Sequence, residues 1–392
     1  MIENTDIEGL LREHGTRGVV LVCHQHLLPS AIPLFQYTLK HVALGRFTWV
    51  LGKPYSTMPL VVHQLDQLGI HVLGHTAGFL HGNYATGIRE DLGTLWRHVE
   101  VSLESTDIER IILIDEGGFL AETIPDSLVS RAVAVEQTTF GTKSRTIRVP
   151  TVQVALSAAK RHFETPVISA AILDRLASLV ADLERRSVGI IGTGPVGRRL
   201  SRDCLAAGLK VAVFDHRSAA MDDLGDAKVC RDVRELLHCS DVILGCTGAD
   251  SVPPDALPKD RGLLFASASS ADIEFNSLVR LVSDRPATLL GSLKVRVGNG
   301  PEHVILNGGF PINFDCRTER EPAAAMLLTR ALMAAGIVQA IKSVEMKPGA
   351  YALDPVCQQE VVRRWAARTG LVQSAAIPTS VDWWVGMEGK AA

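Results

Sequence analysis

The sequence predicts a two-lobed α/β protein, in which a Rossmann dinucleotide-binding domain with a parallel sheet is inserted after a larger α/β substrate domain. Two observations carry this prediction. Residues 188–197 read VGIIGTGPVG, a short apolar strand that runs into a glycine-rich turn. Apolar strand-like runs also alternate with helical patterns along much of the chain, which is typical of a mainly parallel sheet.

The glycine-rich turn opens a complete βαβ unit. Gly192-x-Gly194-x-x-Gly197 leads into a helical pattern, and a second apolar strand follows at 211–214. In this motif one glycine makes the tight turn, one lets the backbone approach a pyrophosphate, and one lets helix and strand pack closely. The helix N-terminus offers unpaired N–H groups to the anion. The alternative, a tight turn without a ligand, does not explain why all parts of the unit follow in register.

Asp215 ends the second strand of this unit. It stands at about the distance of 20 residues expected for the carboxylate that accepts a ribose hydroxyl. A carboxylate would repel the 2′-phosphate of NADP, so the expected cofactor is NAD. Arg217 keeps NADP open as a minority alternative.

Composition narrows the class of protein. The chain of 392 residues is long enough for two or three domains, and 46% hydrophobic residues are ample for buried cores. A net charge of −3 gives no reason to expect a nucleic-acid partner. No run reaches about 18 apolar residues, and residues 1–6 lack the pattern of a signal peptide, so we expect a cytoplasmic protein without a membrane partner.

The cysteines and histidines do not indicate a metal site. Seven cysteines occur without a C-x-x-C pair, and their number is odd, which favours reduced thiols over a disulfide framework. His24-x-His26 could supply two metal ligands, but no third and fourth ligand follows at a usual spacing. We therefore expect no metal.

Residues 19–150 form an α/β layer of their own in this prediction. Strands are expected at 19–23, 47–51, 70–73 and 111–114, and helices at 34–39 and 59–68. In parallel sheets, ligands lie beyond the C-terminal ends of the strands. The side chains expected there are those of His24, His26, Asp115, Glu116 and residues 136–139.

A long helical stretch is predicted over 152–186, with a possible interruption at Pro166, as a bridge into the dinucleotide domain. Lys160 and Glu164 lie one turn apart on this stretch, a spacing that allows an ion pair. From spacing alone, the favoured interpretation is a solvated surface pair of little energetic weight.

The second half continues with buried strands at 241–248 and 262–266, and with a hairpin whose turn is Gly298-Asn-Gly300. An apolar helix at about 322–342 leads out of the domain. The remaining residues, with three tryptophans, are expected to return to the first domain or to serve an oligomer contact. The expected domain limits are 1–186 for the substrate domain with its bridging helix, 187–340 for the NAD-binding domain, and 341–392 for the C-terminal segment.

Taken together, these segments resemble the S-adenosylhomocysteine hydrolase family from about residue 17 to residue 342. The order and spacing of many short pieces carry the resemblance. The pieces are His26 before a helix, YSTM at 55–58, IDEGG at 114–118, VEQTT at 135–139, Val149-Pro150 followed by Lys160, the turn at 192–197, CTG at 246–248, DIE at 272–274 and Ile312-Asn313.

The resemblance implies a reaction. In that family, tightly held NAD⁺ oxidises the ribose 3′-hydroxyl, the ketone acidifies the C4′ proton, and the group on C5′ leaves by β-elimination. Water then adds, and the ketone is reduced back. Lys160 would take the hydroxyl proton, with Glu164 standing where the family has an aspartate. A lysine with the usual pKa near 10.4 is a poor base at pH 7, but desolvation beside the positive nicotinamide should lower that pKa. The resemblance therefore reverses the preference for a solvated pair.

Other site residues also follow from the resemblance alone. His26 matches a substrate-site histidine that could transfer a proton near the leaving group, and Glu116 stands for a second catalytic aspartate. Gln137 replaces the glutamate that holds the sugar hydroxyls. The positions that match cofactor contacts are Thr138, Thr139, Thr247 and Asn313.

Departures from the family pattern gather in the base-binding and leaving-group regions. The family's C-terminal Lys and Tyr tail is not recognisable in residues 384–392. The replaced side chains are Ala155 and Thr165 for two asparagines, Ser270 and Glu321 for two histidines, and Leu28 and Ser30 for a threonine and a glutamate of the base-binding region.

Because the cofactor positions survive better than the leaving-group positions, redox chemistry on a sugar is easier to reconcile with this chain than hydrolysis. We expect an enzyme that oxidises an adenosine-type nucleoside transiently and eliminates a group from it, a lyase or dehydratase that need not add water. The alternatives are a true adenosylhomocysteinase and a catalytically silent NAD-binding regulator. The expected partners are a small-molecule nucleoside and further copies of the chain, in a dimer or tetramer.

Overall fold

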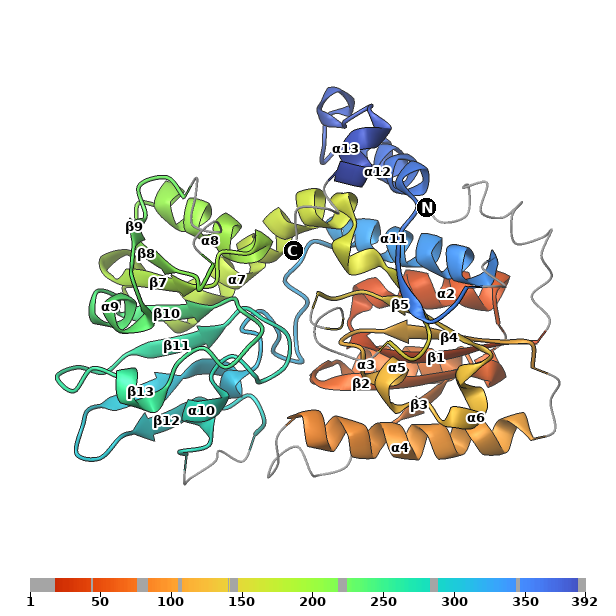
Figure 1. The fold of residues 1–392 in the computed structure, drawn as a ribbon, viewed down its shortest axis with the longest axis horizontal. Helices are drawn as coiled ribbons and strands as arrows, with labels where there is room; N and C mark the ends of the chain where they lie inside the picture. Colours follow the sequence, from red (N-terminus) through yellow and green to blue (C-terminus); the bar gives the residue numbers. More distant parts are fainter. Residues whose placement is uncertain are drawn as a thin grey trace. The chain divides into compact units, whose positions relative to one another are not determined.

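The structure is a computed structural model, which describes residues 18–43, 45–75, 84–104, 108–139, 141, 147–217, 224–282, 288–342 and 346–386. The chain divides into two compact units, each built on a seven-stranded sheet (Figure 1). The first unit contains the chain up to Glu164 and from Pro322 onward, and the second contains Thr165–Glu321 together with Tyr84. The predicted α/β fold with a parallel-sheet dinucleotide domain is confirmed. Residues 1–6 and 387–392, which entered the predictions on the signal peptide and the tail, lie outside the described residues.

The unit boundaries differ from the predicted limits after residues 186 and 340. Helix α7 (Thr165–Leu179) belongs to the second unit because its Ile172 and Leu176 pack with strand residues of that unit's core. Helix α11 (Ala323–Lys342) belongs to the first unit because its Leu332 and Met333 lie in the first core. Apolar packing, which the linear sequence does not display, therefore sets both boundaries.

The sheet of the first unit has the strand order β14-β6-β5-β4-β1-β2-β3, with every neighbouring pair parallel. Helices cover both faces, so the strands are apolar along most of their length. Strand β14, from the C-terminal segment, pairs with β6 at the edge. The strands are β1 (Val19–Leu27), β2 (Thr48–Thr57), β3 (His71–Leu73), β4 (Arg110–Asp115), β5 (Ala132–Glu136), β6 (Pro150–Gln153) and β14 (Gly349–Ala352).

One face of this sheet packs against α2, α3 and α11, and α4 lies along the other face (Figure 1). Among the described residues, α11 alone is long and apolar enough to cross a membrane, yet 78% of that apolar window is buried inside the protein. It is a central core helix of this unit. The helices here are α2 (Ile32–His41), α3 (Pro59–Gln67), α4 (Tyr84–Leu103), α5 (Phe119–Thr123), α6 (Asp126–Val129), α12 (Pro355–Thr369) and α13 (Val381–Gly386).

The sheet of the second unit has the order β12-β13-β11-β10-β7-β8-β9. The arrangement β9-β8-β7-β10-β11 is the strand order of a Rossmann sheet, and only the β12–β13 hairpin is antiparallel. The hairpin predicted around Gly298 is confirmed, and Gly298 has a φ of 57°. The elements are β7 (Ser187–Ile191), α8 (Pro195–Ala206), β8 (Lys210–Phe214), β9 (Lys228–Val229), α9 (Val233–His238), β10 (Val242–Gly245), β11 (Leu264–Ser267), α10 (Asn276–Val279), β12 (Leu293–Arg296) and β13 (Glu302–Ile305).

The prediction of one long helix over 152–186 is wrong at both ends, because α7 stops at Leu179 and a separate 3-10 turn covers Leu183–Arg185. Residues up to Gln153 belong to β6, a 3-10 turn follows, and a π-helical turn at Lys160–Glu164 leads directly into α7. Pro166 does not interrupt the helix. Its missing N–H and its ring are incompatible with an ordinary α-helical turn, whereas the wider turn just before it relieves both conflicts.

Candidate functional site

The glycine turn of the second unit has the geometry of a phosphate-binding loop. Gly192 has a φ of 92°, and a Cβ atom on Gly197 would lie 1.9 Å from the carbonyl oxygen of Gly192, so both positions require glycine. A Cβ atom on Gly194 would meet no protein atom within 4 Å. Gly194 is the N-cap of α8 and caps the helix with no side chain. The N–H groups at the start of α8 therefore border open space at Gly194, the place where this motif receives a pyrophosphate.

Asp215 is fixed at the end of β8 by the turn itself. Its Oδ2 accepts a hydrogen bond from the Thr193 N–H at 2.7 Å, and its Oδ1 accepts one from the Arg217 N–H at 2.9 Å. Burial opposes ionisation, but these backbone hydrogen bonds and the Arg217 side chain outweigh it and hold the pKa of Asp215 below its ordinary value. A carboxylate that is charged at neutral pH therefore lies beside the glycine turn, as its predicted role toward a ribose hydroxyl requires.

A buried carboxylate, Glu274, orders the loop that follows β10. It accepts hydrogen bonds from the N–H groups of Thr247 (3.1 Å) and Gly248 (2.8 Å) and from the Ser269 hydroxyl (2.6 Å). Burial raises the pKa of Glu274. Thr247, predicted to hold the cofactor, is positioned by this carboxylate. The sequence marked residues 272–274 only as a matching piece and gave no sign of this role.

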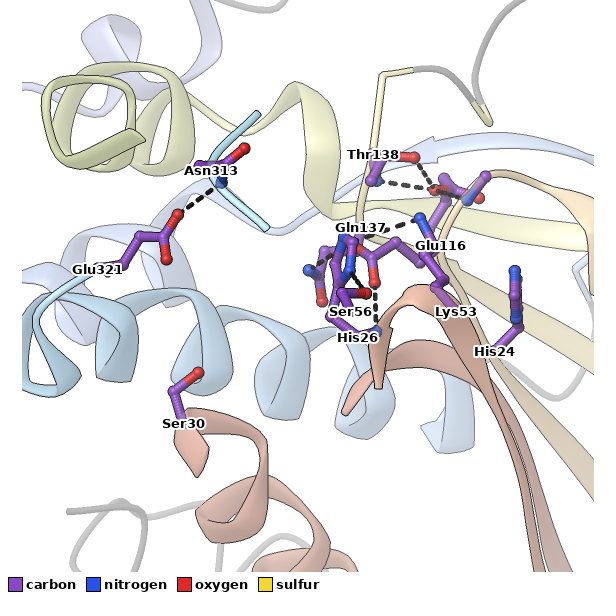
Figure 2. Close-up of polar contacts among 12 residues, drawn as sticks. His24, His26, Ser30, Lys53, Ser56, Glu116, Gln137, Thr138, Asn313 and Glu321 are labelled. Atoms are coloured by element: carbon purple, nitrogen blue, oxygen red, sulfur yellow. Dashed lines mark hydrogen bonds and ion pairs between the residues drawn. The ribbon is translucent and has the colours of Figure 1, made fainter. Parts of the chain in front are cut away.

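Asn313 and Glu321 form a second buried pair in this unit (Figure 2). The amide Nδ2 of Asn313 donates a hydrogen bond to Glu321 Oε1 at 2.7 Å, and both side chains are buried. Glu321, which stands where the resembled family has a histidine, thus accepts a hydrogen bond from Asn313, which was predicted to contact the cofactor.

In the first unit, His26 and Glu116 form the centre of a buried polar cluster (Figure 2). The backbone N–H of His26 donates to Glu116 Oε2 at 2.9 Å, and the ring Nε2 lies 2.9 Å from Oε1. The ring Nδ1 is hydrogen-bonded to the Ser56 hydroxyl. Because Glu116 only accepts when ionised, a neutral His26 carries its proton on Nε2 and accepts from Ser56 on Nδ1.

Three further side chains complete this cluster. Lys53 Nζ lies 3.9 Å from Glu116 Oε1, and Gln137 Nε2 donates to the same oxygen at 3.1 Å. Arg330 of α11 donates through Nη1 to Gln137 Oε1 at 3.3 Å and through Nη2 to Ser30 Oγ at 3.1 Å. The predicted residues His26, Glu116 and Gln137 are therefore brought together, and strands and helix distant in sequence contribute to one site.

Sequence reasoning missed Lys53, Ser56 and Arg330. Two of them could have been noticed in the sequence, because Lys53 and Arg330 are charged residues within a mainly apolar strand and a mainly apolar helix. A charged residue in such a segment is rarely buried without a partner or a function.

The charges of the cluster follow from burial and pairing. Burial lowers the pKa of His26 to about 4, and Glu116 offsets this only in part. For Glu116, burial opposes ionisation, but His26 and Lys53 outweigh it and hold its pKa far below the ordinary value. Burial also disfavours charged Lys53, but Glu116 and Tyr55 raise its pKa above the usual value. At neutral pH, His26 is therefore neutral, Glu116 negative and Lys53 positive.

A second carboxyl pair, Asp115 and Glu136, lies where β4 and β5 end. Glu136 Oε1 accepts from the N–H groups of Gly117 (3.1 Å) and Thr138 (2.7 Å), and from the Thr138 hydroxyl (2.9 Å). Burial and the nearby Asp115 raise the pKa of Glu136 to about 8. Thr138 is thus held by Glu136, whereas Thr139 is exposed. The pair borders a cavity of about 30 Å³, with room for water but not for a dinucleotide, lined in part by Gly118, Thr151 and Gln153.

Lys160 and Glu164 form the ion pair that their spacing allows, but the pair is largely buried, which their spacing did not indicate. Lys160 Nζ lies 2.5 Å from Glu164 Oε2, and the two side chains are only 16% and 9% exposed. The interpretation as a solvated surface pair is therefore wrong. The π-helical turn holds both residues, and removal of one partner would leave the other largely buried and uncompensated.

The prediction that His24 lies beyond the end of its strand is wrong, because β1 continues to Leu27. The ring is fully buried, with Nδ1 3.2 Å from the carbonyl oxygen of Leu51 and its edge against Phe119. Burial, above all, lowers the pKa of His24 to about 3. His24 is a neutral core residue of the first unit.

This burial predicts a loss of stability in mild acid. Unfolded His24 takes up a proton below about pH 6.5, whereas the folded ring does so only near its lowered pKa, so the free energy of unfolding falls as the pH drops through this window. Between pH 7 and pH 5, wild type should lose about 2 kcal/mol more than His24→Gln. Urea unfolding at both pH values measures the difference. Equal losses would show that His24 titrates normally in the folded protein.

Comparison with known proteins identifies the cofactor. Residues 155–250 match the family model of the NAD-binding domain of D-isomer specific 2-hydroxyacid dehydrogenases. The match includes the glycine turn, Asp215 and the loop at Thr247, whose geometry fits a dinucleotide. The chain thus has an NAD-binding, dehydrogenase-like domain, and NAD is its cofactor.

Two uncharacterised proteins of Mycobacterium tuberculosis, from strains CDC 1551 / Oshkosh and ATCC 25618 / H37Rv, are 29% identical to the chain over 344 residues. The alignment covers 85% of this chain and 66% of each relative's length, so the chain spans just under two thirds of these relatives.

Solved structures show weaker likeness. A dipicolinate synthase chain from Bacillus halodurans is 14% identical, with 81% of this chain and 99% of that chain covered and a TM-score of 0.43. The TT0316 protein of Thermus thermophilus is 13% identical, with 81% and 96% covered and a TM-score of 0.38.

Proposed function

We propose that the protein is an NAD-dependent enzyme that resembles adenosylhomocysteinases and acts on an adenosine-type nucleoside. It oxidises a sugar hydroxyl transiently, removes the proton on the neighbouring carbon and eliminates a group by a lyase or dehydratase reaction. One observation carries the proposal. The segment that matches the NAD-binding domain, residues 155–250, contains a largely buried Lys160–Glu164 pair, whose amine and carboxylate are 2.5 Å apart. Burial of an ion pair is costly, so a mostly desolvated Lys–Glu pair favours a functional role over that of a solvated surface ion pair.

Bound NAD⁺ supplies the acceptor for the hydride that leaves the sugar carbon. In the proposal, Lys160 takes the proton of the hydroxyl on that carbon. Glu164 keeps the amine in place through the ion pair and compensates its charge when it is protonated. The side chain of Lys160 retains some solvent exposure, so its proton can exchange with water.

His26 and Glu116 have the arrangement of a proton-transfer pair. The imidazole is fixed in orientation because Glu116 engages one nitrogen and the Ser56 hydroxyl engages the other. In the proposal a proton passes between the ligand and His26 Nδ1 through this hydroxyl, which takes up one proton as it gives up another. We assign His26 to proton transfer near the leaving group and Glu116 to its orientation. We assign Gln137, whose amide donates to Glu116, to a contact with a sugar hydroxyl.

Elimination without water addition is favoured over hydrolysis by the departures in the leaving-group region. Glu321 stands where the resembled family has a histidine, so the chain has no imidazole at this position. The Glu321 carboxylate is hydrogen-bonded to Asn313. A true adenosylhomocysteinase is the first alternative, and a silent NAD-binding regulator is the second. The two missing histidines favour the regulator, whereas the buried Lys160–Glu164 pair speaks against it. Assembly into a dimer or tetramer is part of the proposal.

Product analysis separates these functions. The purified protein is incubated with S-adenosylhomocysteine and, separately, with a panel of adenine nucleosides that carry a leaving group on C5′, and products are identified by mass spectrometry. The proposal expects the loss of a small group, such as one water, from a nucleoside, with little homocysteine release. Rapid release of homocysteine would establish hydrolysis instead, and unchanged substrates across the panel would favour the regulator.

A further inference from the structure

Among the described residues, Arg330 is a buried cation without an ion-pair partner. Its side chain is 1% exposed, and it donates hydrogen bonds to two neutral oxygens, Gln137 Oε1 and Ser30 Oγ. The guanidinium Nε has no hydrogen-bond partner, and within the part of the chain that the structure describes no carboxylate forms an ion pair with it. A buried charge left in this state destabilises a fold unless something else compensates it.

The carboxylate in this cluster is already engaged. Glu116 accepts from the backbone of His26, faces its ring, and balances Lys53. Gln137 lies between Glu116 and Arg330 and carries no charge. With His26 neutral, the cluster contains two positive side chains, Lys53 and Arg330, and one negative side chain, Glu116.

Neither Asp115 nor Glu136 of the neighbouring carboxyl pair forms an ion pair with Arg330 within the described part of the chain. Glu136 accepts from the N–H groups of Gly117 and Thr138, and Asp115 accepts from the Ala121 N–H, so both carboxyls are engaged by the backbone near them.

We propose that Arg330 binds an oxyanion of the substrate, so that this site takes an anionic nucleoside or sugar, one that carries a carboxylate or phosphate. The guanidinium fork suits the planar or tetrahedral oxygens of both groups. The inference rests on the proposed function, because it takes the His26–Glu116–Gln137 cluster as the substrate site. Ser30, the other partner of Arg330, matches a position of the base-binding region in the resembled family, so in this proposal the oxyanion lies at the base end of the ligand.

Gln137 offers an independent test of the charge argument. Its Oε1 lies 3.3 Å from Arg330 Nη1, so a carboxylate at this position would supply Arg330 with a counter-ion from within the chain. Gln137→Glu should therefore weaken binding of the anionic ligand without removing Arg330.

The experiment measures dissociation constants by calorimetry at constant ionic strength, on the full chain loaded with NAD. The probes are adenosine and N6-carboxymethyladenosine, which differ by one carboxylate-bearing group on the base, together with acetate and inorganic phosphate. We expect the carboxymethyl nucleoside to bind more tightly than adenosine, and Arg330→Gln to weaken the binding of the preferred anion about tenfold or more. Acetate and the carboxymethyl nucleoside report a carboxylate site, and phosphate reports a phosphate site. Arg363→Gln, at an exposed arginine of α12, is the matched control and should match wild type.

Two results would overturn the inference. One is that none of the three anions binds wild type measurably; the other is that Arg330→Gln and Gln137→Glu bind every anion as wild type does. An elimination product from a neutral nucleoside in the product assay, combined with either result, would remove the anion site and leave the proposed function standing. Arg330-dependent anion binding without an elimination product from any nucleoside would leave the anion site standing and remove the proposed function.

Discussion

Replacing Lys160 by methionine is expected to lower kcat by roughly 10²–10⁴-fold while NAD stays bound, which is the usual range for loss of a general base. Methionine keeps most of the aliphatic volume but removes the amine that takes the hydroxyl proton. It also leaves the largely buried Glu164 without its counter-charge, so the free energy of unfolding is expected to fall, and turnover is compared at a temperature where both proteins are folded. The residue belongs to the first unit, whereas the NAD-binding match begins at residue 155 and has its glycine turn in the second. Turnover, and the dinucleotide released on denaturation, are measured on the same preparation.

The control for this substitution is Lys294→Met. Lys294 also pairs with a glutamate, at 2.9 Å, but its side chain is 73% exposed on β12. It should leave both turnover and NAD content unchanged. If Lys160→Met retained full turnover, the catalytic assignment would be wrong; if it lost NAD, the pair would be structural support for the cofactor domain.

Alanine at Gly194 is expected to weaken NAD binding by about tenfold to a hundredfold, or ~1.4–2.8 kcal/mol. The added methyl group meets no protein atom within 4 Å, so it occupies the space through which the backbone approaches the pyrophosphate. The free energy of unfolding without NAD should change by less than about 1 kcal/mol, as for a Gly-to-Ala change at an N-cap. Calorimetric titration of the stripped protein with NAD gives the affinity.

Two other glycines frame this result. Gly197→Ala puts its methyl group 1.9 Å from a backbone oxygen and should lower stability and NAD affinity together. Gly93→Ala, in α4 with open space around it, should stabilise the helix by about 1 kcal/mol and leave NAD affinity unchanged. Wild-type affinity in Gly194→Ala would rule out a pyrophosphate against this turn.

The parts of the fold that the sequence predicted well are those that short-range patterns determine. The unit from β7 through α8 to β8 depends on glycines and apolar runs a few residues apart, and the structure confirms it at 187–214. The same holds for the β12–β13 hairpin, where Gly298 requires a positive φ.

Strand pairing between segments far apart in the chain could not be predicted from the sequence. The predicted helix began at residue 152, yet residues 150–153 form a strand because β5 lies on one side and residues 349–352 pair on the other. The boundaries of the units depend likewise on which core receives α7 and α11, and neither helix carries that information in its own periodicity.

The candidate site divides in the same way. The glycine turn and Asp215 could be found from spacing, because one supersecondary unit contains them. Burial of Lys160 and Glu164 could not, since a separation of four residues is equally compatible with a solvated pair. Arg330 reaches the first unit's cluster from α11, and only the folded chain brings it to Gln137.

We propose, above all, that this chain uses NAD to oxidise a sugar carbon reversibly, with Lys160 as the proton acceptor. The most direct measurement adds each nucleoside of the panel, neutral and anionic, to the NAD-loaded protein in deuterium oxide, and follows the absorbance of reduced nicotinamide together with deuterium uptake at C4′. The account predicts nicotinamide reduction and C4′ exchange with at least one nucleoside, and neither in Lys160→Met. Absence of both signals with every nucleoside, or equal signals in Lys160→Met, would contradict it.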